Sequence, residues 1–280
     1  MKNKAFWAAC LVFGTYAFQA QQPSVTQPAA TLVPPALPEC GSLANDTVPI
    51  KAVEAEAPEK TSLPADAGTI TGRVIYEGGE VKKTLNVIKD ERTCGKDDLI
   101  DESLLTGPDG GLEWAVVSIS SEIKGGKSLD ELPGERVLGQ STCVYKPHVV
   151  LVGVNQKLAI NNMDHTLHNV RTASFMNDVV NKVQIYMPNM PHPSDTVTFS
   201  EPEIIDVLCD VHGWMKAYIH VVEHPYYAVT AADGSFKITG VPPGKYTLHV
   251  WHEKLGEQDQ QVEVVAGQAS EIQFTYKKLK

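Results

Sequence analysis

The sequence predicts an all-β protein made of two β-sandwiches. From Gly68 onward, short segments alternate apolar and polar residues, as half-buried strands do, and Pro and Gly residues separate them. No segment carries a helical pattern longer than about ten residues, and "SLDEL" at 128–132 predicts one helical turn. With 280 residues, of which 42% are hydrophobic, the chain is long enough to bury two cores.

The predicted strands run almost to the end of the chain, and turn residues fall between them. They lie at 69–76, 112–120, 148–154, 157–162, 195–200, 203–209, 216–222, 227–231, 234–238, 245–253, 260–266 and 271–276. Many short strands with frequent turn signals are typical of sandwiches rather than of α/β folds, in which helices alternate with strands.

The first twenty residues, 1–20, predict a secretory signal peptide. Lys2 and Lys4 form the basic start, and the short apolar run 5–14 is followed by small residues that suit cleavage. We therefore expect an exported protein in the periplasm or cell envelope of a bacterium. Retention of the segment as an anchor, including a lipid anchor at Cys10, is the alternative.

Residues 21–66 form a Pro- and Ala-rich stretch without hydrophobic periodicity. Such a composition predicts a disordered linker, and this tether could associate with a membrane or cell wall. Cys40 lies in the linker, where pairing with another chain is conceivable; we assign it no role.

The chain is acidic, with 24 Lys and Arg against 34 Asp and Glu and a formal net charge of −10. The basic residues do not cluster, whereas a nucleic-acid-binding protein needs a basic face. We therefore expect no nucleic-acid partner. An acidic exported protein can dock with basic patches on other proteins.

The stretch "CDVHGWM" at 209–215 carries the strongest functional signal. Cys209, His212 and Met215 stand three residues apart between two predicted strands, so a tight loop can turn them toward one point. A thiolate, an imidazole and a thioether suit copper better than calcium, magnesium or zinc. A fourth ligand must come from elsewhere, and "NNMDHTLHNV" at 161–170 offers two histidines. We favour His168 over His165 because a strand resumes directly after it.

Residues 143–222 resemble cupredoxins. "CDVHGWM" is similar to the short ligand loop of the amicyanin-type branch, and "HNV" at 168–170 is similar to the upstream ligand segment of plastocyanin-like proteins. The resemblance implies a Greek-key cupredoxin domain at 140–223. It also implies one copper ion, Cu(I) or Cu(II), in a type 1, blue centre, with four ligands: His168, Cys209, His212 and Met215.

Two further residues are expected to support this centre, and two cysteines to join the domains. Asn169 could join the two ligand segments by hydrogen bonds, and Trp214 could shield the copper or form a docking surface. Export implies an oxidising compartment, and Cys94 and Cys143 are the candidates for a disulfide.

The C-terminal part resembles a second family. "DGSFKITGVPPGKYTLHVWHE" at 233–253 is similar to the carboxypeptidase regulatory-like domain, a transthyretin-like sandwich whose opening strand resembles "GTITGRV" at 68–74. We therefore expect one sandwich split into 67–125 and 224–280, with the cupredoxin domain inserted. This order resembles exported proteins of the methylamine-utilisation type. A plain tandem of two domains is the alternative.

The resemblance implies a carrier of single electrons between periplasmic or envelope partners, not an enzyme, with an unidentified redox protein as partner. One alternative is copper storage or delivery, and another is an envelope interaction protein with a stabilising metal. "YMPNMPHPSD" at 186–195 bears on the first alternative. We interpret it as a Pro-rich surface loop, and a second Cu(I) site formed by Met187, Met190 and His192 is the competing interpretation.

Overall fold

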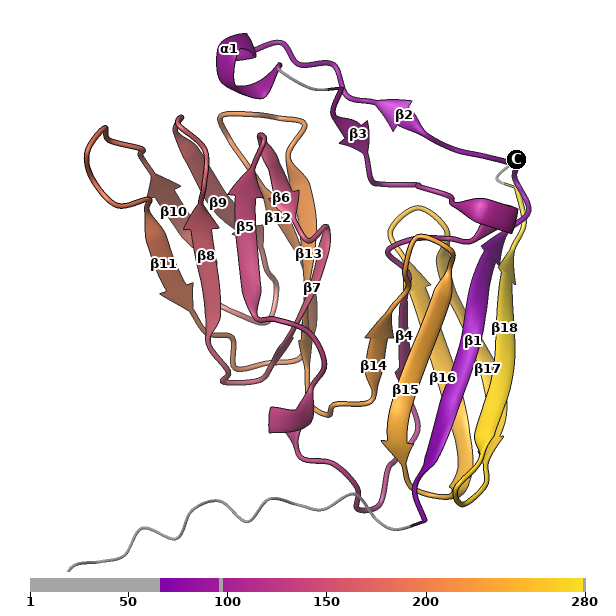
Figure 1. Cartoon of the computed structure of the whole chain (residues 1–280). Helices are drawn as coiled ribbons and strands as arrows, with labels where there is room; N and C mark the ends of the chain where they lie inside the picture. Colours follow the sequence, from indigo (N-terminus) through magenta and orange to yellow (C-terminus); the bar gives the residue numbers. More distant parts are fainter. Residues whose placement is uncertain (1–65, 96–97, 279–280) are drawn as a thin grey trace, which may run out of the picture. The chain divides into compact units, whose positions relative to one another are not determined.

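The computed structural model describes residues 66–95 and 98–278, whose strands form two β-sandwiches (Figure 1). The fold is all-β, as predicted. The predicted signal peptide, Cys10, Cys40 and almost all of the predicted linker lie outside the described residues. Within those residues, none of the helices has the length and apolar character needed to cross a membrane.

One sandwich lies in the middle of the chain, and we call it the central sandwich. Its five-stranded sheet has the order β10-β9-β12-β13-β7 and its four-stranded sheet the order β11-β8-β5-β6. The strands are β5 (Val137–Ser141), β6 (Val144–Lys146), β7 (Val149–Gly153), β8 (Leu158–Asn162), β9 (His168–Ala173), β10 (Asn181–Gln184), β11 (Ser194–Val197), β12 (Glu203–Leu208) and β13 (Lys216–Val222). Side chains of both sheets share one core, with Leu138, Ile160, Ile205 and Ile219 fully buried.

The other sandwich joins segments from the two ends of the described chain, and we call it the terminal sandwich. Its sheets have the orders β15-β1-β18 and β14-β4-β16-β17. The strands are β1 (Gly68–Tyr76), β4 (Val116–Ile119), β14 (Tyr227–Val229), β15 (Ser235–Val241), β16 (Gly244–His252), β17 (Gly256–Val264) and β18 (Ala269–Tyr276). The segments expected to share one sandwich are thus paired in sheets; the domain boundaries stay a prediction.

Local sequence explains why the terminal sandwich closes as it does. In β16, which the predicted strand 245–253 anticipated, every second side chain is buried, and Tyr246, Leu248 and Val250 point inward. The turn before β15 needs Gly234, because its φ is +77° and a Cβ atom at this position would lie 2.3 Å from the carbonyl oxygen of Val74.

Several predictions of single elements need correction. The predicted strand 112–120 is shorter, because only Val116–Ile119 is extended. Strands β5, β6 and β10 were not predicted, since "VLGQS", "VYK" and "NKVQ" are short and mix polar with apolar residues. The turn at 128–132 is confirmed as the 3₁₀ helix η2 (Leu129–Glu131), with Ser128 as its cap.

A long connection runs from β1 to β4 and reaches the central sandwich (Figure 1). It contains β2 (Lys83–Thr84), α1 (Glu91–Cys94), β3 (Ile100–Asp101) and the 3₁₀ helix η1 (Pro108–Gly110). A disulfide with an S–S distance of 2.05 Å links Cys94 at the end of α1 to Cys143 in the turn between β5 and β6. We call residues 85–95 the cover segment, because they lie over the site described next.

Candidate metal centre

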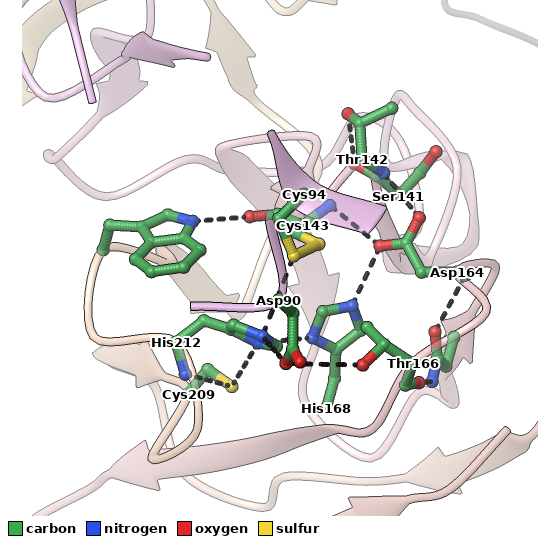
Figure 2. The surroundings of a disulfide bond; sticks show 12 residues. Asp90, Cys94, Ser141, Thr142, Cys143, Asp164, Thr166, His168, Cys209 and His212 are labelled. Atoms are coloured by element: carbon green, nitrogen blue, oxygen red, sulfur yellow. Dashed lines mark hydrogen bonds and ion pairs between the residues drawn. A yellow bond between two sulfur atoms is a disulfide. The ribbon is translucent and has the colours of Figure 1, made fainter. Parts of the chain in front are cut away.

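Three of the four predicted ligands lie together inside the central sandwich. His168 is the first residue of β9, and Cys209 and His212 come from the loop between β12 and β13. One ligand atom of each residue lies within 4.8 Å of the others, and the three side chains are at most 4% exposed (Figure 2). Segments 41 residues apart in sequence, from 168 to 209, therefore meet at one buried point.

Met215 closes the same loop. Its backbone N–H donates to the carbonyl oxygen of His212 at 2.9 Å, which forms a turn directly before β13. The Met215 side chain is 1% exposed and belongs to the same core cluster as Cys209. The loop thus buries the thioether on the side of the core, among the apolar side chains that surround the thiol.

The imidazole rings of His168 and His212 face each other, and a cation between them would stabilise this arrangement. The Nδ1 atoms of His168 and His212 are 3.0 Å apart, while each Nε2 atom lies against a carboxylate, Asp164 at 2.9 Å and Asp90 at 2.8 Å. Because the carboxylates accept the Nε2 protons, both Nδ1 atoms of neutral rings would present lone pairs to each other. Only a proton or a metal ion between them relieves this contact.

Asp164 holds His168 and also a strained turn. Its carboxylate accepts the Nε2–H of His168 and the backbone N–H groups of Thr142 and Cys143, at 2.7 and 2.8 Å (Figure 2). Thr142 and Cys143 have φ values of +55° and +56°, a conformation that a β-branched residue such as Thr rarely adopts. One carboxylate thus fixes the ring of His168 and the position of the disulfide.

The cover segment closes the outer side of His212. The Asp90 carboxylate accepts from Nε2, and the Cys94 Sγ atom lies 3.8 Å from the same nitrogen. The His212 side chain is therefore 0% exposed although it comes from a loop. Neither the role of Asp90 nor that of Asp164 was predicted. Asp164 stands four residues before His168, a spacing that could have drawn attention to it, whereas Asp90 carries no local signal.

Electrostatics favour the charged form of the thiol. Burial raises the pKa of Cys209, but hydrogen bonds from His168 and His212 outweigh burial and lower the pKa to about 5. Burial lowers the pKa of His168, but its hydrogen bonds to Asp164 and Cys209 outweigh burial, so this pKa is raised. In the metal-free centre the surroundings thus favour a thiolate at Cys209 and the protonated form of the His168 ring.

In the metal-free protein we expect the ultraviolet absorbance of the Cys209 thiolate to titrate near pH 5. The pKa in the folded chain lies below the value of about 8.5 in an unfolded chain. The thiolate therefore stabilises the fold fully when the pH is above the unfolded-chain pKa of about 8.5, and this stabilisation is lost as the pH falls through about 5. A midpoint near that of a free thiol would contradict the geometry, and Cys209→Ser serves as the blank.

Asn169 joins the two ligand segments. Its side-chain oxygen accepts the backbone N–H of Asp210 at 2.7 Å, and its amide nitrogen donates to the Asp210 carboxylate at 2.9 Å. Arg171 donates to the same carboxylate at 2.7 Å. Since Asn169 follows His168 and Asp210 follows Cys209, the network holds the two ligand-bearing backbones at a fixed distance.

The remaining candidates take different places. Trp214 is half-buried, its ring centroid lies 5.1 Å from that of His212, and its indole N–H donates to the Cys143 carbonyl oxygen at 3.0 Å. His165 is exposed and stacks on Tyr186, with ring centroids 4.4 Å apart, so it takes no part in the centre.

The Asp164→Asn variant should weaken metal binding by about 10- to 100-fold, the usual cost of losing a carboxylate partner of a ligand histidine. The amide cannot accept from His168 and from both backbone N–H groups as a carboxylate does. Competition with a Cu(I) chelator measures the effect. Asp206→Asn is the matched control, because Asp206 lies on β12 and pairs with Lys216 on the surface. An equal affinity in both variants would contradict the assigned role.

The family model of the carboxypeptidase regulatory-like domain matches residues 215–277. This range covers β14 to β18 of the terminal sandwich. It also includes β13, which the structure places in a sheet of the central sandwich. None of the curated proteins matches the chain in sequence.

Solved structures similar to part of the chain include amicyanin, a purple cupredoxin and a copper-containing nitrite reductase. A point mutant of amicyanin in its Cu(I) form is 17% identical, with 38% of this chain and 98% of that chain covered and a TM-score of 0.28. A purple cupredoxin from Nitrosopumilus maritimus is 16% identical over 31% of this chain and 96% of that chain, with a TM-score of 0.25. A copper-containing nitrite reductase from Thermus scotoductus is 14% identical, and only 25% of its length is covered, with a TM-score of 0.28.

Proposed function

We propose that this chain is an exported carrier of single electrons with one copper ion in a type 1, blue centre. The ligands are His168, Cys209, His212 and Met215. The observation that carries the proposal is the pair of Nδ1 atoms 3.0 Å apart beside a thiol whose pKa is lowered to about 5. Two imidazoles and a thiolate, with a buried thioether on the same loop, form a donor set that suits copper.

The ligand set suits both oxidation states of copper. Cu(II) favours nitrogen donors and Cu(I) favours soft sulfur donors, and a centre with both types serves each state. The side chains are held before any metal arrives: Asp164 and Asp90 fix the two rings, and Asn169 ties the two segments. When bound, the copper ion supplies the one-electron couple. The rigid sandwich limits the rearrangement that accompanies a change of charge.

Burial favours a carrier over an enzyme. The four proposed ligands are protein side chains with exposed fractions of 0% for His168, 4% for Cys209, 0% for His212 and 1% for Met215. A substrate has no direct approach to them, whereas an electron needs only a short path. The ring of His212 lies beside half-buried Trp214, and we propose this side for electron exchange.

The disulfide and the net charge support the proposed export and the proposed kind of partner. A disulfide that covers the centre suits an oxidising compartment such as the periplasm or the cell envelope. The net charge of −10 favours a redox protein partner with a basic docking face over any nucleic acid. The predicted linker 21–66 would let a carrier attached to a membrane or cell wall reach its partner at a distance from that surface.

Voltammetry of the copper-loaded, full-length protein tests the proposal. We expect a reversible one-electron wave. In Met215→Leu the wave should persist at a higher potential, because Cu(I) accepts a centre with three ligands more readily than Cu(II) does. Met176→Leu is the matched control, since Met176 is 66% exposed on another loop. Release of copper on each reduction, without a reversible wave, would contradict the electron-carrier function.

A further inference from the structure

Two loops of the central sandwich meet beside the candidate metal centre. One joins β8 to β9 at 163–167, and the other joins β10 to β11 at 185–193. Hydrogen bonds hold them together: the backbone N–H of Asn162 donates to the Pro193 carbonyl oxygen at 2.9 Å, and its side chain donates to that of Gln184 at 3.0 Å. The relative position of the two loops is therefore fixed.

Each loop contributes one histidine to a common surface cluster. The ring centroids of His165 and His192 are 5.7 Å apart, and Tyr186 stacks on His165 at 4.4 Å. An imidazole nitrogen binds a transition metal at about 2.0 Å, so two rings that share one ion have centroids at most about 6.4 Å apart. The two histidines are thus close enough for one ion.

The ring of His192 is held by a hydrogen bond in the way that is common for metal-binding histidines. Its Nδ1 atom lies 2.9 Å from the carbonyl oxygen of Asn162, which can only accept, so Nδ1 carries the proton and Nε2 keeps a free lone pair. A ligand histidine commonly donates its other N–H to a backbone carbonyl in this way. Among residues 66–95 and 98–278, the side chain of His165 has no hydrogen-bond partner, and it is exposed.

Three methionines of the same two loops are unusually exposed. Met163 is 54%, Met187 54% and Met190 57% exposed, whereas methionine is more often buried. Met187 and Met190 lie in one turn, in which the Met190 N–H donates to the Met187 carbonyl oxygen at 3.1 Å. Burial of hydrophobic surface does not explain these side chains, but thioether donors on the same two loops as the two imidazoles match a soft monovalent cation.

We propose that His165 and His192, together with thioethers from Met163, Met187 and Met190, bind one Cu(I) ion at the surface. This site is separate from the buried centre and does not depend on its proposed electron-carrier role. All the donors are neutral, and the soft thioethers favour Cu(I) over magnesium, calcium or zinc. The proposal revises the interpretation of 186–195 as a simple surface loop, because the structure adds His165 to its donors.

Anaerobic Cu(I) titration of the full-length protein against a colorimetric chelator tests the site. We expect the double variant His165→Ala/His192→Ala to bind one equivalent less than the unmodified protein. The control His249→Ala replaces a partly exposed histidine of β16 and should lose none. Comparing variants removes any contribution from Cys40. An unchanged stoichiometry in the double variant would overturn the proposal.

Two further measurements keep the outcome unambiguous. In Cys209→Ser, which disables the buried centre, the equivalent assigned to His165 and His192 should remain. With Ag(I), a diamagnetic stand-in for Cu(I), the NMR signals of both rings should shift together at a stoichiometric amount of metal. In Met187→Leu/Met190→Leu the shift should require more Ag(I). Ring signals that stay in place would overturn the site, whatever the state of the buried centre.

Discussion

The Cys209→Ser variant should bind Cu(I) more than about 100-fold more weakly than the unmodified protein. Loss of a hydrogen-bond partner of a ligand costs up to about 100-fold, and loss of the ligand itself should cost more. Serine keeps the size of the side chain but removes the soft sulfur, and its hydroxyl does not ionise at ordinary pH. His168 and His212 then lose the thiolate beside them and keep only the carboxylates at their Nε2 atoms. Chelator competition measures the loss.

The metal-free Cys209→Ser chain should still fold, because serine keeps the volume of the side chain in the core, but at neutral pH its unfolding midpoint should be lower because the stabilising thiolate is lost. Circular dichroism and the unfolding midpoint check this point. The control is Cys40→Ser, which removes a cysteine of the predicted linker. A Cys209→Ser protein that binds Cu(I) as tightly as this control would show that the thiolate is not a ligand.

Removal of the Cys94–Cys143 disulfide is the second change with a large expected effect. The bond joins residues 49 apart, and a loop of this length predicts a loss of about 4 kcal/mol from the free energy of unfolding. Urea unfolding of metal-free Cys94→Ala/Cys143→Ala, compared with Cys40→Ala, measures this loss. A change below about 1 kcal/mol would contradict the prediction.

The same double variant should expose His212. The disulfide and the Asp90–His212 contact hold the cover segment over this ring. Without the disulfide, we expect a chelator to remove copper faster than from the unmodified protein. Asp90→Asn is the companion variant, because it weakens the contact but leaves the disulfide. Equal removal rates in all three proteins would mean that the segment does not control access.

The sequence predicted the parts of the structure that depend on local pattern. The alternation in 245–253 predicted β16 with its inward side chains, and the spacing of 209–215 predicted a loop that turns Cys209 and His212 toward one point. Preference for His168 over His165 also agrees with the geometry, because a histidine at the start of β9 is held by its strand. The metal and the four ligands stay a prediction.

The Cys94–Cys143 disulfide was predicted and is confirmed, but other long-range contacts were not predicted, for a physical reason. Asp90 acts on His212 from 122 residues away and from a segment without regular periodicity, so only the folded chain brings the two together. Strand β10 was missed because the apolar Val183 is exposed while the polar Gln184 is buried, which is the reverse of the expected pattern. The pairing of His165 with His192 likewise depends on the meeting of two loops.

The visible absorption spectrum of the copper-loaded, full-length protein tests the central claim most directly. With one equivalent of Cu(II), we expect an intense blue colour from charge transfer between the Cys209 sulfur and the metal, absent in Cys209→Ser. The proposed surface site, which includes Met163, Met187 and Met190, should add no blue colour, because it contains no thiolate. A nearly colourless Cu(II) complex of the unmodified protein would contradict a thiolate-bound copper centre.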